Sequence, residues 1–169
     1  MVVSPFREWI VPALLAFALA LGAASGFARE SATGGANPLS EALVPDPALS
    51  PAEVIRIQLE ALRHNDDQDR GIAIAFRFAS PANRANTGPL PRFIAMIRQG
   101  PYALMLDFRE AAYGPVETVS DRARQRVTLT SARESVTYWF YLSQQSEAPY
   151  ADCWMTDAVY IERSGGQVT

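Results

Sequence analysis

Few side chains in this sequence of 169 residues could take part in catalysis. The chain holds one histidine, His64, one cysteine, Cys153, and no lysine. Without lysine there is neither Schiff-base chemistry nor the lysine of a phosphate-binding loop. A single histidine and a single cysteine can form neither a zinc site built from His and Cys ligands nor an intrachain disulfide. We therefore expect no metal and no cofactor.

Asp157 is the acidic residue best placed for acid–base chemistry. It lies in the middle of an expected strand, where a carboxylate that faced the core would need a partner such as Arg124 or Arg126. If Asp157 instead faced a cavity together with Tyr102 or Tyr138, the pair could exchange protons with a substrate. A carboxylate that faces solvent or pairs with arginine is the simpler interpretation, and we favour it.

His64 and Cys153 each have a simple structural explanation. His64 falls at the polar end of the first expected helix, where a cation suits the helix dipole, so we favour a helix-end residue over a general base. Cys153 is interpreted as a buried small residue between strand neighbours. A free thiol or a pair between two chains is the alternative for Cys153.

The aspartates within residues 66–69 resemble the start of a calcium loop, but the match fails. With Asn65 as the first position of an EF-hand loop, Arg70 takes the place of the required glycine. Phe76 then stands where a bidentate glutamate is required. These acids are predicted to line a turn and to cap the following helix, where negative charge is favourable.

Aromatic side chains are dense in the last part of the chain. They could line a pocket for an apolar ligand, or form an outer patch that meets a partner protein, and ordinary core packing is the alternative. The residues concerned are Tyr138, Trp139, Tyr141, Trp154 and Tyr160.

Helices are predicted in the first part of the folded region. Residues 50–53 form a capping box with proline at the first helical position, and the helix should stop near His64 and Asn65. Apolar spacing predicts a second helix over residues 71–79 and a third over 91–99. The stretch up to Gly88 is expected to be a loop or a single helical turn.

Four strands are predicted to follow, because the apolar period changes from 3.6 towards 2. They are residues 108–119 with a break at Gly114, 123–130, 136–143 and 153–162. Connections of this length without helices indicate an antiparallel meander. The expected class is α+β, with N-terminal helices packed on a curved four-stranded antiparallel sheet.

The N-terminus reads as a targeting segment. Residues 9–28 carry no charge and end in small residues, which is typical of a secretory signal with cleavage after Ala24 or Ala28. An uncleaved membrane anchor is the alternative. We predict a signal peptide or anchor over 1–28, a flexible linker over 29–49, one domain over 50–162 and a tail over 163–169. The domain is expected to be exported (periplasmic, lumenal or secreted), with membrane contact only if the segment is uncleaved.

Three runs of sequence resemble an uncharacterised family known as domain of unknown function 4864. They are VIRIQLEALRHND from Val54, GIAIAFRFASPANR from Gly71 and TGPLPRFIAMIR from Thr87, and the closing CWMTDAV from Cys153 strengthens the resemblance. The resemblance implies a cone-shaped fold of the nuclear-transport-factor-2-like and cystatin-like group. It implies no reaction, cofactor or catalytic residue. An enzyme of that shape would use a His–Asp or Asp–Tyr pair inside the cone.

The leading functional hypothesis is therefore a non-catalytic exported domain that binds a small apolar ligand or a partner protein. A cofactor-independent isomerase or hydrolase that uses Asp157 with Tyr102 or His64 is the first alternative, and a membrane-tethered scaffold is the second. The net charge of −3 gives no basic excess for nucleic acid.

Overall fold

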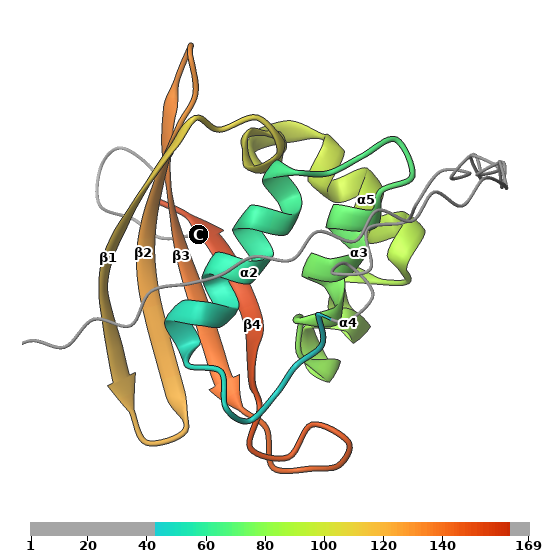
Figure 1. The fold of residues 1–169 in the computed structure, drawn as a ribbon, viewed down its shortest axis with the longest axis vertical. Coiled ribbons are helices and arrows are strands. Elements are labelled where there is room, and N and C mark those ends of the chain that lie inside the picture. Colours follow the sequence, from blue (N-terminus) through green and yellow to red (C-terminus); the bar gives the residue numbers. More distant parts are fainter. Residues whose placement is uncertain (1–42, 163–169) are drawn as a thin grey trace, which may run out of the picture. The chain divides into compact units, whose positions relative to one another are not determined.

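A computed structural model describes residues 43–162 of the chain. Five helices come first and are followed by four strands, so the predicted α+β class is confirmed (Figure 1). The helices are α2 (Pro51–Arg63), α3 (Arg70–Arg77), α4 (Pro81–Thr87), α5 (Leu90–Arg98) and the 3-10 helix η1 (Gly100–Leu106), and the strands are β1 (Glu110–Val119), β2 (Arg122–Thr130), β3 (Ser135–Gln144) and β4 (Trp154–Ile161). The predicted signal or anchor segment, most of the predicted linker and the predicted tail lie outside the described residues.

Helix α2 begins and ends as its sequence predicts. The Ser50 side chain accepts a hydrogen bond from the Glu53 N–H, and the Glu53 carboxylate accepts one from the Ser50 N–H, which completes the capping box. His64 is the C-cap residue. The buried face of α2 packs on the sheet through Val54, Ile55, Leu59 and Leu62.

The turn between α2 and α3 differs from the prediction in one respect. Asp69 occupies the N-cap position of α3 but makes no side-chain cap, because its backbone is left-handed with φ of 57°. The Asp66 carboxylate accepts hydrogen bonds from the N–H groups of Gln68 and Arg70 instead. The acidic turn therefore does accept hydrogen bonds from backbone N–H groups at the start of α3, through Asp66.

Helix α4 and the 3-10 helix η1 complete the helical layer. Ser80 caps α4 by accepting from the Asn83 N–H, and Pro81 takes the first helical position, so the stretch predicted as a loop or single turn is a helix of seven residues. Helix α5 ends at Arg98, close to the predicted end, and residues 100–106 then form η1, which the apolar spacing did not predict.

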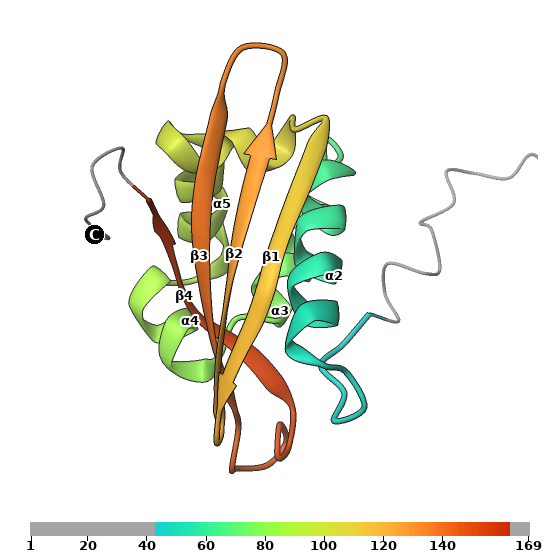
Figure 2. The same cartoon turned by 90° about the vertical axis from the view of Figure 1, so that its left-hand side faces the viewer.

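The sheet is an antiparallel meander in the order β1-β2-β3-β4, as predicted. The register of β1 shifts between Tyr113 and Val116, at the predicted break. All helices lie on one face of the twisted sheet (Figures 1 and 2). The inner face contributes Val127, Leu129, Tyr138, Phe140 and Leu142 to the core.

Strand β4 is one edge of the sheet, and the junction of α3 and α4 covers part of that edge. The Thr156 N–H donates to the Phe78 carbonyl, and the Thr156 carbonyl accepts from the Ser80 N–H, both at 2.9 Å. This short parallel bridge fixes the helices against the last strand, and beyond it a space opens between β4 and the helices.

Candidate functional site

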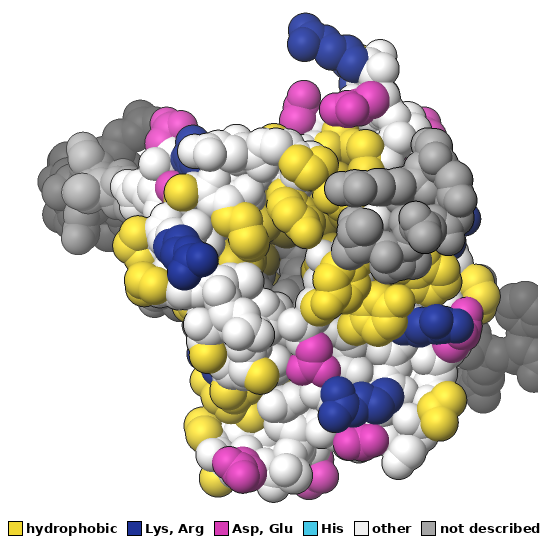
Figure 3. Space-filling model, turned by 180° about the vertical axis from the view of Figure 1, so that it is seen from behind, with side chains coloured by type: hydrophobic (Ala, Val, Ile, Leu, Met, Phe, Trp, Pro, Cys, Tyr) yellow, Lys and Arg dark blue, Asp and Glu magenta, His cyan; other side chains and the backbone are white. Residues whose placement is uncertain are grey.

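A cavity of about 270 Å³ lies between edge strand β4 and the helices. Residues of α4, α5 and η1 line it opposite β4, and residues of α2, α3 and β3 complete the lining. Figure 3 shows the molecule from behind, with a hollow flanked by hydrophobic side chains. Its volume lies just below the usual range of small-molecule sites, about 300–1,000 Å³, and its mixed lining is typical of them.

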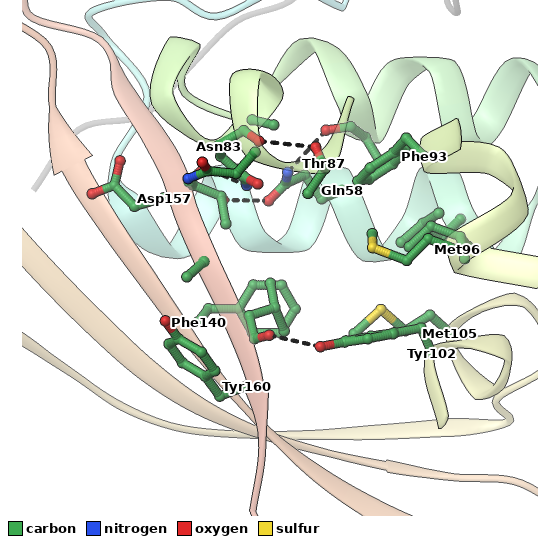
Figure 4. A pocket seen from close by; sticks show the side chains of 18 residues that line it. Gln58, Asn83, Thr87, Phe93, Met96, Tyr102, Met105, Phe140, Asp157 and Tyr160 are labelled. Carbon is green, nitrogen blue, oxygen red and sulfur yellow. Dashed lines mark hydrogen bonds between the residues drawn. The ribbon is translucent and has the colours of Figure 1, made fainter. Parts of the chain in front are cut away.

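Neutral polar groups gather on one side of the cavity, next to α4 (Figure 4). Thr156 Oγ1 donates to Gln58 Oε1 at 2.7 Å, and Gln58 Nε2 donates to the Ala75 carbonyl at 3.0 Å. Asn83 Nδ2 donates to the Thr156 carbonyl at 2.9 Å, and Thr87 Oγ1 donates to the Asn83 carbonyl at 2.9 Å. Asn83 and Thr87 are four positions apart and so share one face of α4.

Apolar side chains form the other side of the cavity. They are Phe93, Met96, Ile97, Met105 and Phe140. Figure 4 shows Met96 and Met105 away from the amide and hydroxyl groups of α4, and Phe93 between those groups and Met96. The cavity therefore has a polar end and an apolar end.

Tyr102, one of the proposed acid–base residues, lines the cavity, and its hydroxyl is hydrogen-bonded to another lining residue. Tyr102 Oη donates to the Val159 carbonyl at 3.0 Å and thus ties η1 to the free edge of β4. Burial raises the pKa of Tyr102 above its ordinary value of 10.0. The phenol is therefore a structural donor at neutral pH.

The carboxylate of Asp157 points away from the cavity (Figure 4). Asp157 lies where the register of β3 and β4 shifts, between the partners of Tyr141 and Leu142. Its carboxylate accepts from Ser143 Oγ at 3.0 Å and from Arg122 Nη1 at 3.4 Å. The favoured interpretation, an arginine-paired aspartate, is confirmed, but the arginine is neither of the two predicted.

Arg124 and Arg126 have other partners on the outer face of the sheet. Arg124 pairs with Glu117, and Arg126 pairs with Glu162, each at 2.6 Å. Both arginines are therefore already paired with carboxylates on the outer face.

His64 lies apart from the cavity, at the end of α2. Its Nδ1 is 2.9 Å from the Glu60 carbonyl and 3.6 Å from the Glu60 carboxylate. This is the helix-end position that the sequence indicated. In residues 43–162, no hydrogen bond joins any two of His64, Tyr102 and Asp157.

The aromatic residues singled out in the sequence are divided between the two faces of the sheet. Tyr138 is fully buried and donates to the Pro101 carbonyl. Trp139 lies under the Arg124 guanidinium on the outer face, and Tyr141 meets the Tyr160 ring edge-on at 5.6 Å. Trp154 is half-buried against the core. Of the five, Tyr160 lines the cavity.

Cys153 is a buried free cysteine, and burial raises the pKa of its thiol, in keeping with the structural interpretation. Across the described part of the chain, no group of His, Cys, Asp and Glu side chains could hold a metal ion. The same residues include no helix long and apolar enough to cross a membrane.

The neutral polar residues at the α4 side of the cavity, Gln58, Asn83, Thr87 and Thr156, were not among the residues singled out in the sequence. Asn83 and Thr87 fall in the stretch expected to be a loop or single turn, where no shared face could be assigned. The capping pattern of Ser80 and Pro81 is the signal that could have revealed helix α4, since Ser before Pro is a typical helix start.

A family model described as "Domain of unknown function (DUF4864)" matches residues 48–169. Searches of curated proteins and of solved structures gave no match. The likeness to the cone-shaped folds therefore stays a prediction.

Proposed function

The chain belongs to the DUF4864 family, and from that premise we propose that it is a binding module that holds one small, largely apolar molecule in the cavity beside β4. The family description supplies no activity, so the support comes from the cavity. Its wall is mostly apolar, with a few neutral hydrogen-bonding groups gathered at one end, which is the usual composition of ligand sites.

The side chains around the cavity favour binding over catalysis. An acid–base catalyst needs a titratable group within hydrogen-bond reach of the reacting atom. Three titratable residues line the cavity: Asp157 turns its carboxylate outward, Tyr102 donates its proton to a backbone carbonyl, and the Tyr160 ring packs edge-on against Tyr141. The isomerase or hydrolase alternative would need a pair that these contacts do not assemble.

The outer face of the sheet favours a small ligand over a partner protein. Arg122, Arg124 and Arg126 lie in a row on β2, and each already pairs with a carboxylate of the same face. A partner docked on this face would have to bury these ion pairs, and desolvation of charge opposes that.

Native mass spectrometry of the full chain, purified from the organism that makes it, tests the proposal. We expect a reproducible extra mass of one small molecule per chain. Met96→Trp, which fills the apolar end, should abolish the extra mass. Ala95→Trp places the same ring on the exposed side of α5 and should retain it. A wild-type protein that carries no extra mass, and that no neutral small molecule stabilises, contradicts the proposal.

Export is a separate proposal and rests on residues 1–28 alone. Sequencing the N-terminus of the natural protein tests it. A chain that starts after Ala24 or Ala28 supports a cleaved signal. An intact N-terminus in the membrane fraction supports the tethered scaffold, and an intact N-terminus in the cytoplasm contradicts both.

A further inference from the structure

Four residues with a hydroxyl group line the cavity, and three of them, Thr87, Tyr102 and Thr156, have already given their proton to a protein oxygen. The bonds run from Thr156 to Gln58 Oε1, from Thr87 to the Asn83 carbonyl and from Tyr102 to the Val159 carbonyl. A hydroxyl has one proton and accepts further bonds through its oxygen. Towards the cavity, these three hydroxyls can therefore only accept hydrogen bonds.

Asn83 offers the complementary group beside Thr87. Its Nδ2 donates one proton to the Thr156 carbonyl, which fixes the orientation of the amide. The second proton of Nδ2 has no acceptor among residues 43–162. Figure 4 shows the Asn83 and Thr87 side chains next to each other. A ligand hydroxyl can therefore donate to Thr87 Oγ1 and accept from Asn83 Nδ2 at the same time.

Within residues 43–162, the cavity offers no counter-ion to a charged ligand. No arginine of this range lines it, and its one lining carboxylate, that of Asp157, is turned outward and paired with Arg122. A charged group moved from water into this site would lose its hydration without gaining an ion pair. The described lining therefore favours an uncharged ligand.

The size of the cavity and its apolar end indicate the length and the character of the rest of the ligand. The volume of about 270 Å³ equals that of about nine water molecules at about 30 Å³ each. Met96 and Met105 flank the apolar end, and methionine adapts its shape to an unbranched chain. The space suits a hydrocarbon chain that carries one polar group.

From these observations we infer that the ligand is a neutral amphiphile whose head group donates a hydrogen bond, a hydroxyl or a primary amide, on a chain of about eight carbons. The head binds Thr87 and Asn83, and the chain lies against Met96, Met105 and Phe93. The inference rests on the proposed function, since it names the kind of molecule that the same cavity takes.

Calorimetric titration of the full chain with three probes of nearly equal size tests the inference. The probes are 1-octanol, heptyl methyl ether, which has the oxygen but no proton to donate, and octanoate, which is charged. We expect 1-octanol to bind about tenfold more tightly than the ether, because the ether leaves the acceptors unpaired. Octanoate should bind more weakly than 1-octanol.

A matched pair of variants assigns the preference to one oxygen. Thr87→Val keeps the shape of the side chain and removes the accepting oxygen, so 1-octanol should fall to the affinity of the ether while the ether is unchanged. Thr118→Val makes the same change at an exposed position of β1 and should leave both affinities as they are. The comparison of the probes on the wild-type chain holds even if a variant fails to fold.

The outcomes separate the two proposals. If none of the three probes binds, the proposed function fails and the inference fails with it. If the ether equals 1-octanol, or octanoate binds most tightly, ligand binding stands and the head-group inference is overturned. If Thr87→Val keeps the full preference for 1-octanol, the role of Thr87 is overturned.

Discussion

Gln58 in α2 and Thr156 in β4 are 98 positions apart and hold each other inside the protein by a hydrogen bond of 2.7 Å. The two residues are 6% and 1% exposed. Because Gln58 also donates to the Ala75 carbonyl, one buried amide connects α2, α3 and β4. These are the elements beneath the polar end of the cavity, so this contact positions the candidate site.

Removing one partner of the Gln58–Thr156 pair should destabilise the protein, because the other partner stays buried without its hydrogen bond. Thr156→Val leaves the Gln58 oxygen buried without a donor, and Gln58→Leu leaves the Thr156 hydroxyl without its acceptor. We expect each change to lower the free energy of unfolding by about 1–3 kcal/mol. The double variant should lose less than the sum of the two, as measured by urea denaturation. Strictly additive losses would mean that the two side chains do not act as a pair.

The Tyr102 hydroxyl should contribute to the attachment of η1 to the sheet edge. Tyr102→Phe removes its bond to the Val159 carbonyl and should lower the free energy of unfolding by about 1 kcal/mol. Tyr160→Phe is the matched control, since in residues 43–162 the Tyr160 hydroxyl makes no hydrogen bond, and it should stay within about 0.5 kcal/mol of wild type. Equal effects of the two changes in urea denaturation would contradict the role of the Tyr102 bond.

Local signals predicted much of the fold. The capping box at Ser50, the alternation along β2 and β3 and the break at Gly114 each act over a few residues, and the structure retains all three. Helix α4 escaped prediction because none of its residues is buried, so no apolar stripe marks it. It is held by its cap and by contacts with β4, which are distant in sequence.

The candidate site could not be read from the sequence for two physical reasons. The register shift near Asp157 changes which residues of β4 face inward, and a shift of one residue reverses every side chain beyond it. The sequence therefore left the direction of the Asp157 carboxylate open. The cavity also depends on α4 and η1, the two elements that the apolar spacing did not assign.

Acid should weaken the protein partly through Asp69. The Arg98 guanidinium and the Asn65 amide, both hydrogen-bonded to this carboxylate, hold its pKa below the ordinary 3.8. The folded state therefore binds this proton less readily than the unfolded chain. The stabilisation is complete above about pH 5, where the carboxyl is ionised in the unfolded chain as well, and is lost as the pH falls through the folded pKa.

Asp69→Asn tests this contribution. Asparagine tolerates the left-handed backbone at this position, so the change removes the charge with little added strain. The variant should be less stable than wild type at pH 7, and its urea midpoint should fall less on acidification below about pH 5. Asp67→Asn, at an exposed carboxylate without a hydrogen bond or ion pair in the described residues, is the control and should stay within about 0.5 kcal/mol of wild type at pH 7. Identical acid profiles for Asp69→Asn and wild type would contradict the assignment.

Gly71 should tolerate no side chain, because α2 and α3 touch at this position. A Cβ atom built on Gly71 would overlap the Ala61 carbonyl oxygen and lie 2.9 Å from the Asn65 Cα, and both are backbone atoms that cannot move aside. We expect Gly71→Ala to lower the free energy of unfolding by about 3 kcal/mol or more, since overpacking forces the helices apart. Gly100→Ala is the control: it meets open space, so its φ of 61° alone should cost about 1 kcal/mol. A urea midpoint for Gly71→Ala equal to or above that of Gly100→Ala would mean that α2 and α3 can separate freely. The part of the cavity that these two helices line would then be able to change shape as well.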